Sequence, residues 1–307
     1  MKALITGGAG FLGSRIAEAL LVHGHEVTVI DNLSTGSAAN VDPLVDFVEG
    51  DIRRKRDIPE GDWEVIYHCA ASYKDRADWE GDASTNVLGT INVLRAAKHT
   101  GAKVIYCQTS LCYGPDPYAG MPRRSAYPLS ISHRLDPHGS YAVSKTAGET
   151  YIMDSGVPFV SLRLANMYGP RNLSGPVPAF YKRLSEGKPC TVVDSRRDFV
   201  YVDDMVWVSV KAATAGDGVY HVSSGTDLPI VDIYLAVADA MGVEAPEPTL
   251  VPRGPDDVAT LLLDPLRTKA TFGWTAQTTL AKGVEKAVAW YRKNGVTTTF
   301  THLAQKG

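Results

Sequence analysis

Residues 6–13 read Thr-Gly-Gly-Ala-Gly-Phe-Leu-Gly and join two segments of different periodicity. Residues 2–6 form a short apolar run that predicts a buried strand, and residues 12–23 carry apolar side chains at helical intervals. Glycines at 7, 10 and 13 permit a tight turn, a close approach of the backbone to a ligand, and close packing of helix on strand. Because the N–H groups that open such a helix attract phosphate, the stretch predicts a turn that binds a dinucleotide.

Strand-like runs alternate with helix-like segments through the first half of the chain. The expected strands are residues 26–31, 46–48, 65–69, 103–107 and 159–162, and the expected long helices are residues 83–99 and 140–154. This alternation implies right-handed crossovers and a parallel sheet with helices on both faces. We therefore expect an α/β fold with a Rossmann-type, doubly wound parallel sheet.

The chain changes character past residue 170, where proline and glycine become dense and the segments shorten. We expect residues 1–170 to form the dinucleotide-binding domain, joined by a later return strand near 219–223. Residues 171–307, with helices at 232–241 and 280–292, are expected to form mainly a smaller substrate-binding lobe. This lobe should cover the carboxyl edge of the sheet, where open α/β sheets bind ligands.

Composition argues against several classes of partner. The 307 residues are 44% hydrophobic and 21% charged with a net charge of −3, and no long run of Lys or Arg offers a footprint for nucleic acid. The apolar stretches are too short to span a bilayer, and no signal segment precedes the first strand, so we expect a cytoplasmic protein. Neither the cysteines (69, 107, 112 and 190) nor the histidines (23, 99, 133 and 138) show metal-ligand spacing, so we expect reduced thiols and no metal.

Asp31 ends the second expected strand, at the place where a carboxylate accepts hydrogen bonds from both ribose hydroxyls of an adenosine. It would repel a 2′-phosphate, and no basic residue follows it, since the next residue is Asn32. These features favour NAD over NADP. Asp51 and Ile52, just after the third strand, are expected to flank the adenine, although an isolated Asp51 would more often cap a helix.

Tyr141 and Lys145 lie one turn apart at the start of an expected helix, so their side chains share one face. A phenol with an ordinary pKa of about 10 is a poor base at neutral pH. A nearby ammonium and a positively charged nicotinamide favour the phenolate and lower that pKa. We expect Tyr141 to take a proton from a substrate hydroxyl while hydride leaves for NAD, and Lys145 to hold the nicotinamide ribose.

Together these residues resemble the extended short-chain dehydrogenase/reductase family, in its nucleotide-sugar epimerase/dehydratase branch typified by UDP-glucose 4-epimerases. The resemblance runs from Met1 to about Trp274. The motifs that carry it lie at residues 6–13, 31–33, 50–52, 68–71, 86–90, 141–145, 162–170 and 197–202. Residues 71–75 and 108–114 are most similar to bacterial surface-polysaccharide epimerases.

The resemblance implies a role for further residues. The cofactor set it completes is Gly7, Gly10, Phe11, Leu12, Gly13, Asp31, Asn32, Asp51, Ile52, Ala70, Ala71, Asn86, Tyr141 and Lys145. Asn166, Arg197 and Arg253 are expected to contact the substrate diphosphate, since the fork of an arginine suits phosphate oxygens. Tyr73 is expected to face the sugar or the nicotinamide.

The family's catalytic Ser or Thr stands four positions before a Tyr-Gly pair. Here that pair begins at Tyr113, which selects Thr109, with Ser110 as the alternative if the turn is shifted. Related dehydratases carry an acidic pair just after this hydroxyl, and decarboxylases usually keep a Glu there. In this chain the two positions hold Ser110 and Leu111, and Leu111 neither gives nor takes a proton. Elimination therefore lacks its acid/base group, which favours epimerisation.

The resemblance thus implies NAD-dependent epimerisation at C4 of a UDP-hexose or UDP-hexuronate, through a transient 4-keto intermediate. A dehydratase, a decarboxylase or a 4-ketoreductase acting on a nucleotide sugar is the first alternative. A non-catalytic NAD-binding scaffold or sensor is the second, and it would not need Thr109, Tyr141 and Lys145 together. The family also implies a homodimer that pairs through the helices at 83–99 and 140–154.

Overall fold

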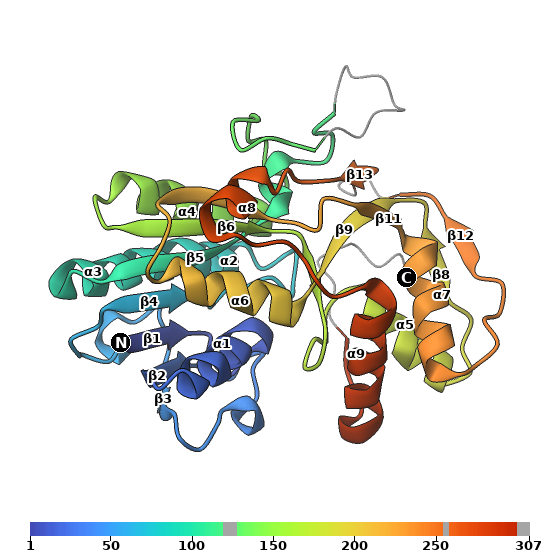
Figure 1. Ribbon diagram of the computed structural model, residues 1–307, viewed down its shortest axis with the longest axis horizontal. Helices are drawn as coiled ribbons and strands as arrows, with labels where there is room; N and C mark the ends of the chain where they lie inside the picture. Colours follow the sequence, from blue (N-terminus) through green and yellow to red (C-terminus); the bar gives the residue numbers. More distant parts are fainter. Residues whose placement is uncertain (119–127, 254–257, 300–307) are drawn as a thin grey trace.

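Seven parallel strands form the main sheet of the computed structural model, which describes residues 1–118, 128–253 and 258–299 (Figure 1). The strand order is β10-β6-β5-β4-β1-β2-β3, and every neighbouring pair is parallel. The strands are β1 (Lys2–Thr6), β2 (Glu26–Asp31), β3 (Asp46–Glu49), β4 (Val65–His68), β5 (Lys103–Thr109), β6 (Phe159–Leu164) and β10 (Gly218–Val222). The predicted Rossmann-type α/β fold is therefore confirmed.

Successive residues of the central strands enter two separate hydrophobic clusters, one on each face of the sheet. Ile5 of β1 packs with one cluster and Leu4 with the other, as the two-residue period of a strand requires. The first face is covered by α1 (Phe11–Val22) and α6 (Val202–Ala212), which pack on each other. The second is covered by α3 (Thr90–Thr100) and α4 (Ser140–Asp154). The remaining short elements of this half are η1 (Ala38–Asn40), η2 (Lys55–Asp57) and η4 (Ser110–Tyr113).

The helix expected at residues 83–99 begins earlier than predicted. It starts with α2 (Trp79–Ala83), continues through a π-helical segment, η3 (Ser84–Gly89), and ends with α3. The carboxylate of Asp78 caps α2 by accepting a hydrogen bond from the N–H of Gly81 at 2.8 Å. The apolar spacing begins only after this first turn, so periodicity alone did not reveal it.

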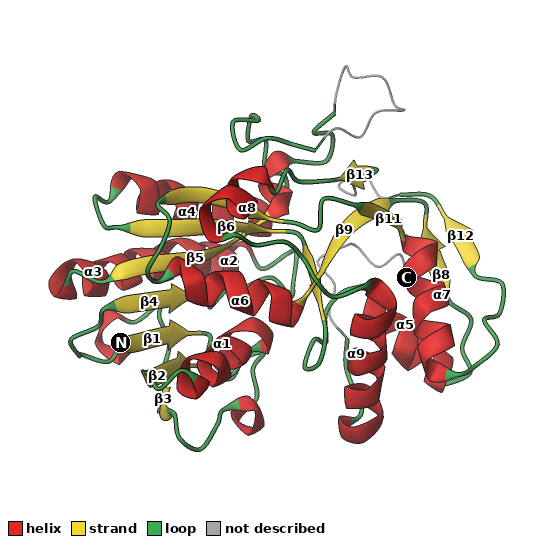
Figure 2. Cartoon of the chain, viewed as in Figure 1, coloured by secondary structure: helices red, strands yellow, loops and turns green. Residues whose placement is uncertain are grey.

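A smaller lobe lies beyond the carboxyl ends of the main sheet (Figure 2). It contains a four-stranded sheet of β7 (Asn166–Tyr168), β9 (Arg196–Tyr201), β11 (Asp227–Pro229) and β13 (Thr260–Leu261), and a pair formed by β8 (Thr191–Val193) and β12 (Thr249–Val251). Three helices pack together there, α5 (Pro176–Ser185), α7 (Ile230–Met241) and α9 (Leu280–Asn294). The chain returns to the main sheet through α6, β10 and α8 (Leu266–Phe272). The boundary expected at residue 170, between a dinucleotide-binding domain and a substrate-binding lobe, remains a prediction.

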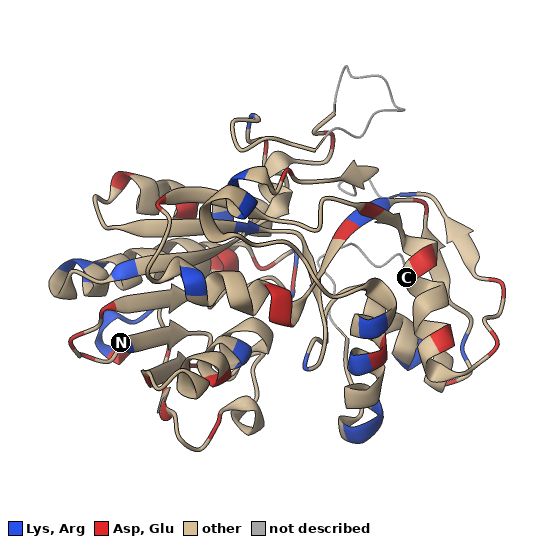
Figure 3. Ribbon diagram, viewed as in Figure 1, with Lys and Arg blue, Asp and Glu red and all other residues tan. Residues whose placement is uncertain are grey.

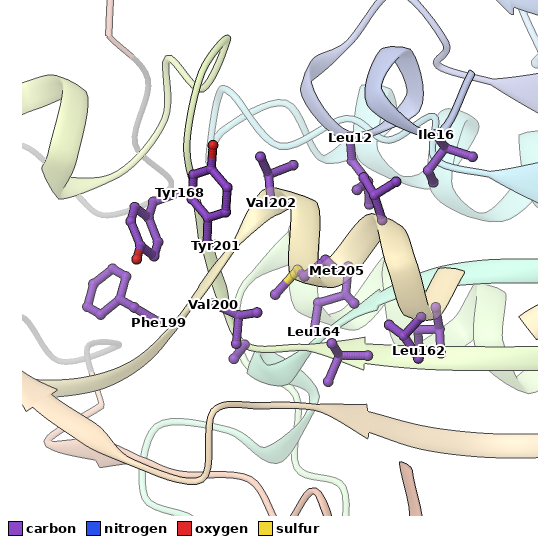
Figure 4. Close-up of a cluster of buried hydrophobic side chains, with 14 of the residues drawn as sticks. Leu12, Ile16, Leu162, Leu164, Tyr168, Phe199, Val200, Tyr201, Val202 and Met205 are labelled. Carbon is purple, nitrogen blue, oxygen red and sulfur yellow. The ribbon is translucent and has the colours of Figure 1, made fainter. Parts of the chain in front are cut away.

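A continuous apolar seam joins the two lobes (Figure 4). Strand β9 leads directly into α6, and Val202 and Met205 at the start of that helix are fully buried. They belong to the same cluster as Leu12 of α1 and Leu164 of β6. Fully burying one such side chain contributes about 1.5–3 kcal/mol, so the seam holds the smaller lobe against the strand ends.

Charged side chains of both signs are spread over both lobes (Figure 3). Across the described residues, no helix combines the length and the apolar composition needed to cross a bilayer.

The main sheet reverses its strand order between β1 and β4, and such a reversal opens a crevice at the carboxyl ends of the strands.

Candidate active site

The glycine turn after β1 forms one wall of a cleft of about 650 Å³. Gly7 has a positive φ of 68°, and a Cβ there would lie 2.6 Å from the backbone nitrogen of Ala70 on the neighbouring strand end. A Cβ at Gly13 would collide with the carbonyl oxygen of Gly7. The turn therefore requires glycine, and its predicted neighbours Gly10, Phe11 and Leu12 line the same cleft.

Asp31 stands where this cleft meets a second cavity of about 230 Å³, and it lines both. Its carboxylate accepts hydrogen bonds from the N–H of Ala9 at 3.0 Å and from the N–H of Leu33 at 2.8 Å. Burial raises the pKa of Asp31, and the two backbone hydrogen bonds oppose that rise. Each oxygen keeps a lone pair for a further donor, as a ribose contact requires.

The second cavity also holds the residues expected at the adenine. Asn32, Asp51 and Ile52 line it, as does Arg53. Burial alone would raise the pKa of Asp51, but hydrogen bonds from Arg53 and Asn32 lower it overall. Ala70 and Ala71 line both cavities, so the two form one continuous groove along the strand ends. A groove with a glycine cradle at its middle and a strand-end carboxylate fits NAD.

Asp31→Asn is expected to weaken NAD binding by about 10- to 100-fold, because hydrogen bonds to a charged group contribute about 1.5–3 kcal/mol. NADP should lose less affinity, because the charge that repels its 2′-phosphate is removed. Dissociation constants for both dinucleotides measure the change, with the exposed Asp46→Asn as a matched control on the next strand. An unchanged ratio of the two constants would remove Asp31 from cofactor selection.

Two hydroxyl groups meet in the cleft at the start of α4. Tyr141 lies in the first turn of α4, and Thr109 is the last residue of β5. The Thr109 hydroxyl is hydrogen-bonded to the phenol of Tyr141 and also accepts the N–H of Leu111 at 3.2 Å. Ser110, the alternative hydroxyl, lines the cleft but is 5% exposed. The structure therefore brings Thr109, rather than Ser110, to Tyr141.

Burial sets the acidity of the Tyr141 phenol. It raises the pKa above the ordinary value, the charge of Asp82 adds to the rise, and the hydrogen bond with Thr109 opposes it. The lowering of this pKa expected from the ammonium of Lys145 together with a bound nicotinamide remains a prediction.

Lys145 is buried, with 2% of its surface exposed, and it is not among the residues that line either cavity. Its ammonium stands 3.9 Å from the centre of the Tyr106 ring. Burial lowers the pKa of Lys145 to about 8. Its backbone carbonyl accepts hydrogen bonds from the Tyr106 hydroxyl at 2.9 Å and from the Gln108 amide at 3.1 Å, which fix α4 against β5.

A third cavity of about 370 Å³ opens from the same point into the smaller lobe. Tyr141, Leu111 and Asn166 line both this cavity and the cofactor cleft. Tyr73 lines all three cavities, and its ring meets that of Tyr141 edge-on at 6.1 Å between centroids. A molecule bound in the third cavity therefore presents one end to Tyr141 beside the cofactor cleft.

The residues expected at a diphosphate are only partly brought together. Arg197, 9% exposed, lines the third cavity, and one of its guanidinium nitrogens donates to the carbonyl of Arg196 at 2.7 Å. The amide of Asn166 donates to the carbonyl of Asp198 at 3.2 Å. Arg253 is exposed and outside the residues that line the cavity, and the segment 254–257 that follows it lies outside the described residues.

Asn86 is placed behind the groove rather than along it. Its side chain is 1% exposed, and its amide donates to the Ser72 carbonyl and the Ser144 hydroxyl, both at 2.9 Å. Its carbonyl accepts the N–H of Ser72 at 2.9 Å. These bonds tie the loop after β4 to α4, so Asn86 holds Tyr73 and Tyr141 in relation to each other.

Sequence reasoning missed Asp82, which lies in α2 and lines the third cavity. It is 1% exposed, and one carboxylate oxygen has no hydrogen-bond partner among the residues that the structure describes. Burial raises its pKa, whereas hydrogen bonds from the Ser72 and Ser140 hydroxyls oppose that rise. An aspartate in a helix looks like an ordinary surface residue, so no local signal marks it.

Comparisons with known proteins agree with this arrangement. The family model described as "NAD dependent epimerase/dehydratase family" matches residues 3–223. The UDP-glucose 4-epimerase of Mycolicibacterium smegmatis is 32% identical over 95% of this chain and 99% of its own length. Proteins named as dehydratases and decarboxylases match as well, at 28–29% identity.

Two solved structures from Bordetella bronchiseptica are similar over nearly the whole chain. WbmH in complex with NAD+ is 44% identical with a TM-score of 0.89, covering 96% of this chain and 99% of that one. WbmG in complex with NAD and UDP is 40% identical with a TM-score of 0.87, covering 98% of both chains.

Proposed function

The chain belongs to the NAD-dependent epimerase/dehydratase family, and we propose that it inverts C4 of a UDP-hexose or UDP-hexuronate. The hydrogen-bonded pair of Thr109 and Tyr141, at the meeting point of the cofactor cleft and the third cavity, is the observation that carries this proposal. The UDP named with WbmG and the name of the M. smegmatis epimerase support the nucleotide and the reaction.

Each residue of the site has a separate role, which depends on its position. Bound NAD supplies reversible hydride acceptance. Tyr141 takes the proton of the sugar hydroxyl, and Thr109 orients that hydroxyl and relays the proton. Arg197 and Asn166 hold the diphosphate, while the walls of the third cavity leave the oxidised sugar free to turn and be reduced on its other face. Oxidation and reduction cancel, so the reaction consumes no dinucleotide.

The positions that follow Thr109 distinguish epimerisation from elimination. Leu111 lines both the cofactor cleft and the third cavity, where an acidic side chain would be needed to remove a proton from the sugar. Asp82 is a carboxylate near Tyr141 that accepts hydrogen bonds from the hydroxyls of Ser72 and Ser140. Because its charge raises the pKa of Tyr141, we assign Asp82 a positioning role.

The decisive experiment incubates the protein separately with UDP-glucose, UDP-N-acetylglucosamine and UDP-glucuronate, and follows the products by proton NMR. We expect the 4-epimer of at least one sugar to form without added reductant and without accumulation of NADH. A 4-keto-6-deoxy product or released carbon dioxide would establish a dehydratase or a decarboxylase instead. Stoichiometric consumption of NADH would establish a 4-ketoreductase.

Asp82→Asn is expected to shift the acidic limb of the pH profile of kcat to lower pH. The negative charge of Asp82 raises the pKa of Tyr141, so its removal lets the phenol ionise at lower pH. The measurement is kcat as a function of pH. The control is Glu80→Gln, which removes an exposed charge from the same helix, since Asp78 caps α2 and its substitution would disturb that helix. A limb that moves to higher pH, or not at all, would contradict the positioning role.

We also propose that the protein is a cytoplasmic homodimer. Large hydrophobic side chains are exposed on the two helices expected to pair, with Leu88 44%, Val143 49%, Tyr151 49% and Met153 53% exposed. Pairing would bury them in a helical bundle. The four cysteines, all free, suit a reducing compartment. Sedimentation should show a dimer at micromolar concentration, and a monomer alone would refute it.

A further inference from the structure

Two thiols face each other across the floor of the cofactor cleft. Cys69 directly follows β4, and Cys107 lies in β5. The register of these parallel strands sets His68 opposite Tyr106, so Cys69 and Cys107 form the next pair toward the carboxyl edge. Their sulfur atoms are 3.5 Å apart, and both residues line the cleft together with Thr109 and Tyr141. The proposed mechanism uses neither thiol.

The surroundings make the two thiols unequal. The hydrogen bond between them and the positive charge of Lys145 lower the pKa of Cys107, whereas its bond to Cys107 and burial raise the pKa of Cys69. Cys107 is therefore the more acidic of the two thiols. A thiolate beside a cation with a second thiol in reach is the arrangement of a reactive dithiol.

The other two cysteines provide internal controls. Cys112 is fully buried in a hydrophobic cluster, and Cys190 is 3% exposed in the main core. Burial raises the pKa of both, that of Cys112 to about 12. Neither lines any of the three cavities described above.

We propose that Cys69 and Cys107 form an oxidisable dithiol site, open to hydrogen peroxide only while the cleft is free of dinucleotide. The Cys107 thiolate attacks one peroxide oxygen, the O–O bond breaks, and a sulfenic acid and hydroxide form. The Cys69 sulfur then displaces the sulfenic oxygen, which leaves as water when it takes up the Cys69 proton. The two sulfurs lose two electrons in total, which reduce the peroxide.

The strands need not separate for this bond to form. Neighbouring strands lie about 4.7–4.9 Å apart, within the range of about 4.4–6.8 Å between Cα atoms that a disulfide spans. The sulfurs must close from 3.5 Å to about 2.05 Å, which rotation of the side chains provides. The disulfide would change the shape of the cleft floor near Thr109 and Tyr141, and a dithiol reductant should reverse it.

Peptide mapping tests the proposal directly. The protein, stripped of dinucleotide with charcoal, is treated with hydrogen peroxide, alkylated, and digested with trypsin. Cys69 and Cys107 fall in peptides 57–74 and 104–123, and the Cys112→Ala variant removes the second cysteine of the latter. We expect these two peptides to be cross-linked in both proteins. NAD at a hundred times its Kd should slow the cross-link about 100-fold, because only the open form reacts.

Two variants complete the test. Cys69→Ser should leave a sulfenic acid on Cys107 that dimedone traps, without a cross-link, whereas Cys190→Ala should behave as the parent protein. Absence of the cross-link in the parent protein, equal oxidation of Cys190, or equal rates with and without NAD would overturn the proposal. Because the readout is a peptide map, it stands apart from the sugar specificity of the enzyme.

Discussion

Tyr141→Phe is expected to lower kcat by about 10³-fold while NAD remains bound, because the variant loses the proton acceptor and little else. The ring of Tyr141 keeps its edge contact with Tyr73, and only the hydroxyl that bonds Thr109 is removed. Turnover of the sugar nucleotide identified by NMR gives kcat. Titration of the stripped protein gives the Kd for NAD, which should change by less than about threefold.

Tyr151→Phe is the matched control for this variant. Tyr151 lies on the same helix, α4, but is 49% exposed and faces away from the three cavities. It should turn over substrate at the parent rate. Unchanged turnover in Tyr141→Phe would remove the phenol from the mechanism, and loss of bound NAD would assign Tyr141 to cofactor binding instead.

Lys145→Met is expected to make the protein more stable and at the same time nearly inactive. Burial lowers the pKa of Lys145 from its ordinary 10.5 to about 8, so the folded chain holds this proton less tightly than the unfolded chain. The charge therefore costs stability at every pH below about 8, and the cost fades as the pH rises from 8 towards 10.5. Methionine fills nearly the same volume without a charge.

The expected gain at pH 7 is about 2 kcal/mol, after allowance for the lost contact with the Tyr106 ring. The gain should be small near pH 10.5, where the lysine is neutral in the folded state and half protonated in the unfolded state. Denaturant unfolding at both pH values measures it. Lys211→Met is the control, because that lysine also stands over an aromatic ring, Trp207, but is exposed. A less stable Lys145→Met at pH 7 would show that the charge is better paired than its burial implies.

The two predictions together give a reason why a charge that destabilises the fold is retained at this site. The ammonium of Lys145 is buried beside the Tyr106 ring, and we expect it to hold the nicotinamide ribose and to stabilise the phenolate of Tyr141 during turnover. Burial also raises the pKa of Tyr141. Stability is thus given up at the site where charge is needed during the reaction.

Much of the fold follows from local pattern. Residues 2–6, 26–31 and 140–154 form β1, β2 and α4 with the predicted bounds, because apolar period and glycine punctuation are properties of neighbouring residues. Strand β5 extends past its predicted end at Cys107 to Thr109. The two extra residues are polar, so apolar spacing does not predict them. Their pairing with β6 keeps them in the strand, with Thr109 opposite Leu164.

The sequence by itself determined the glycine turn, the strand-end carboxylate of Asp31 and the spacing of Tyr141 and Lys145. Each is a short motif within one strand, turn or helix, where the local backbone conformation sets how the side chains are spaced. Only the tertiary structure decided that Tyr73 joins three cavities and that Cys69 faces Cys107. Those contacts join residues far apart in the chain. The register of β4 and β5 brings the two cysteines together, and the hydrogen bonds of Asn86 with Ser72 hold the loop that carries Tyr73.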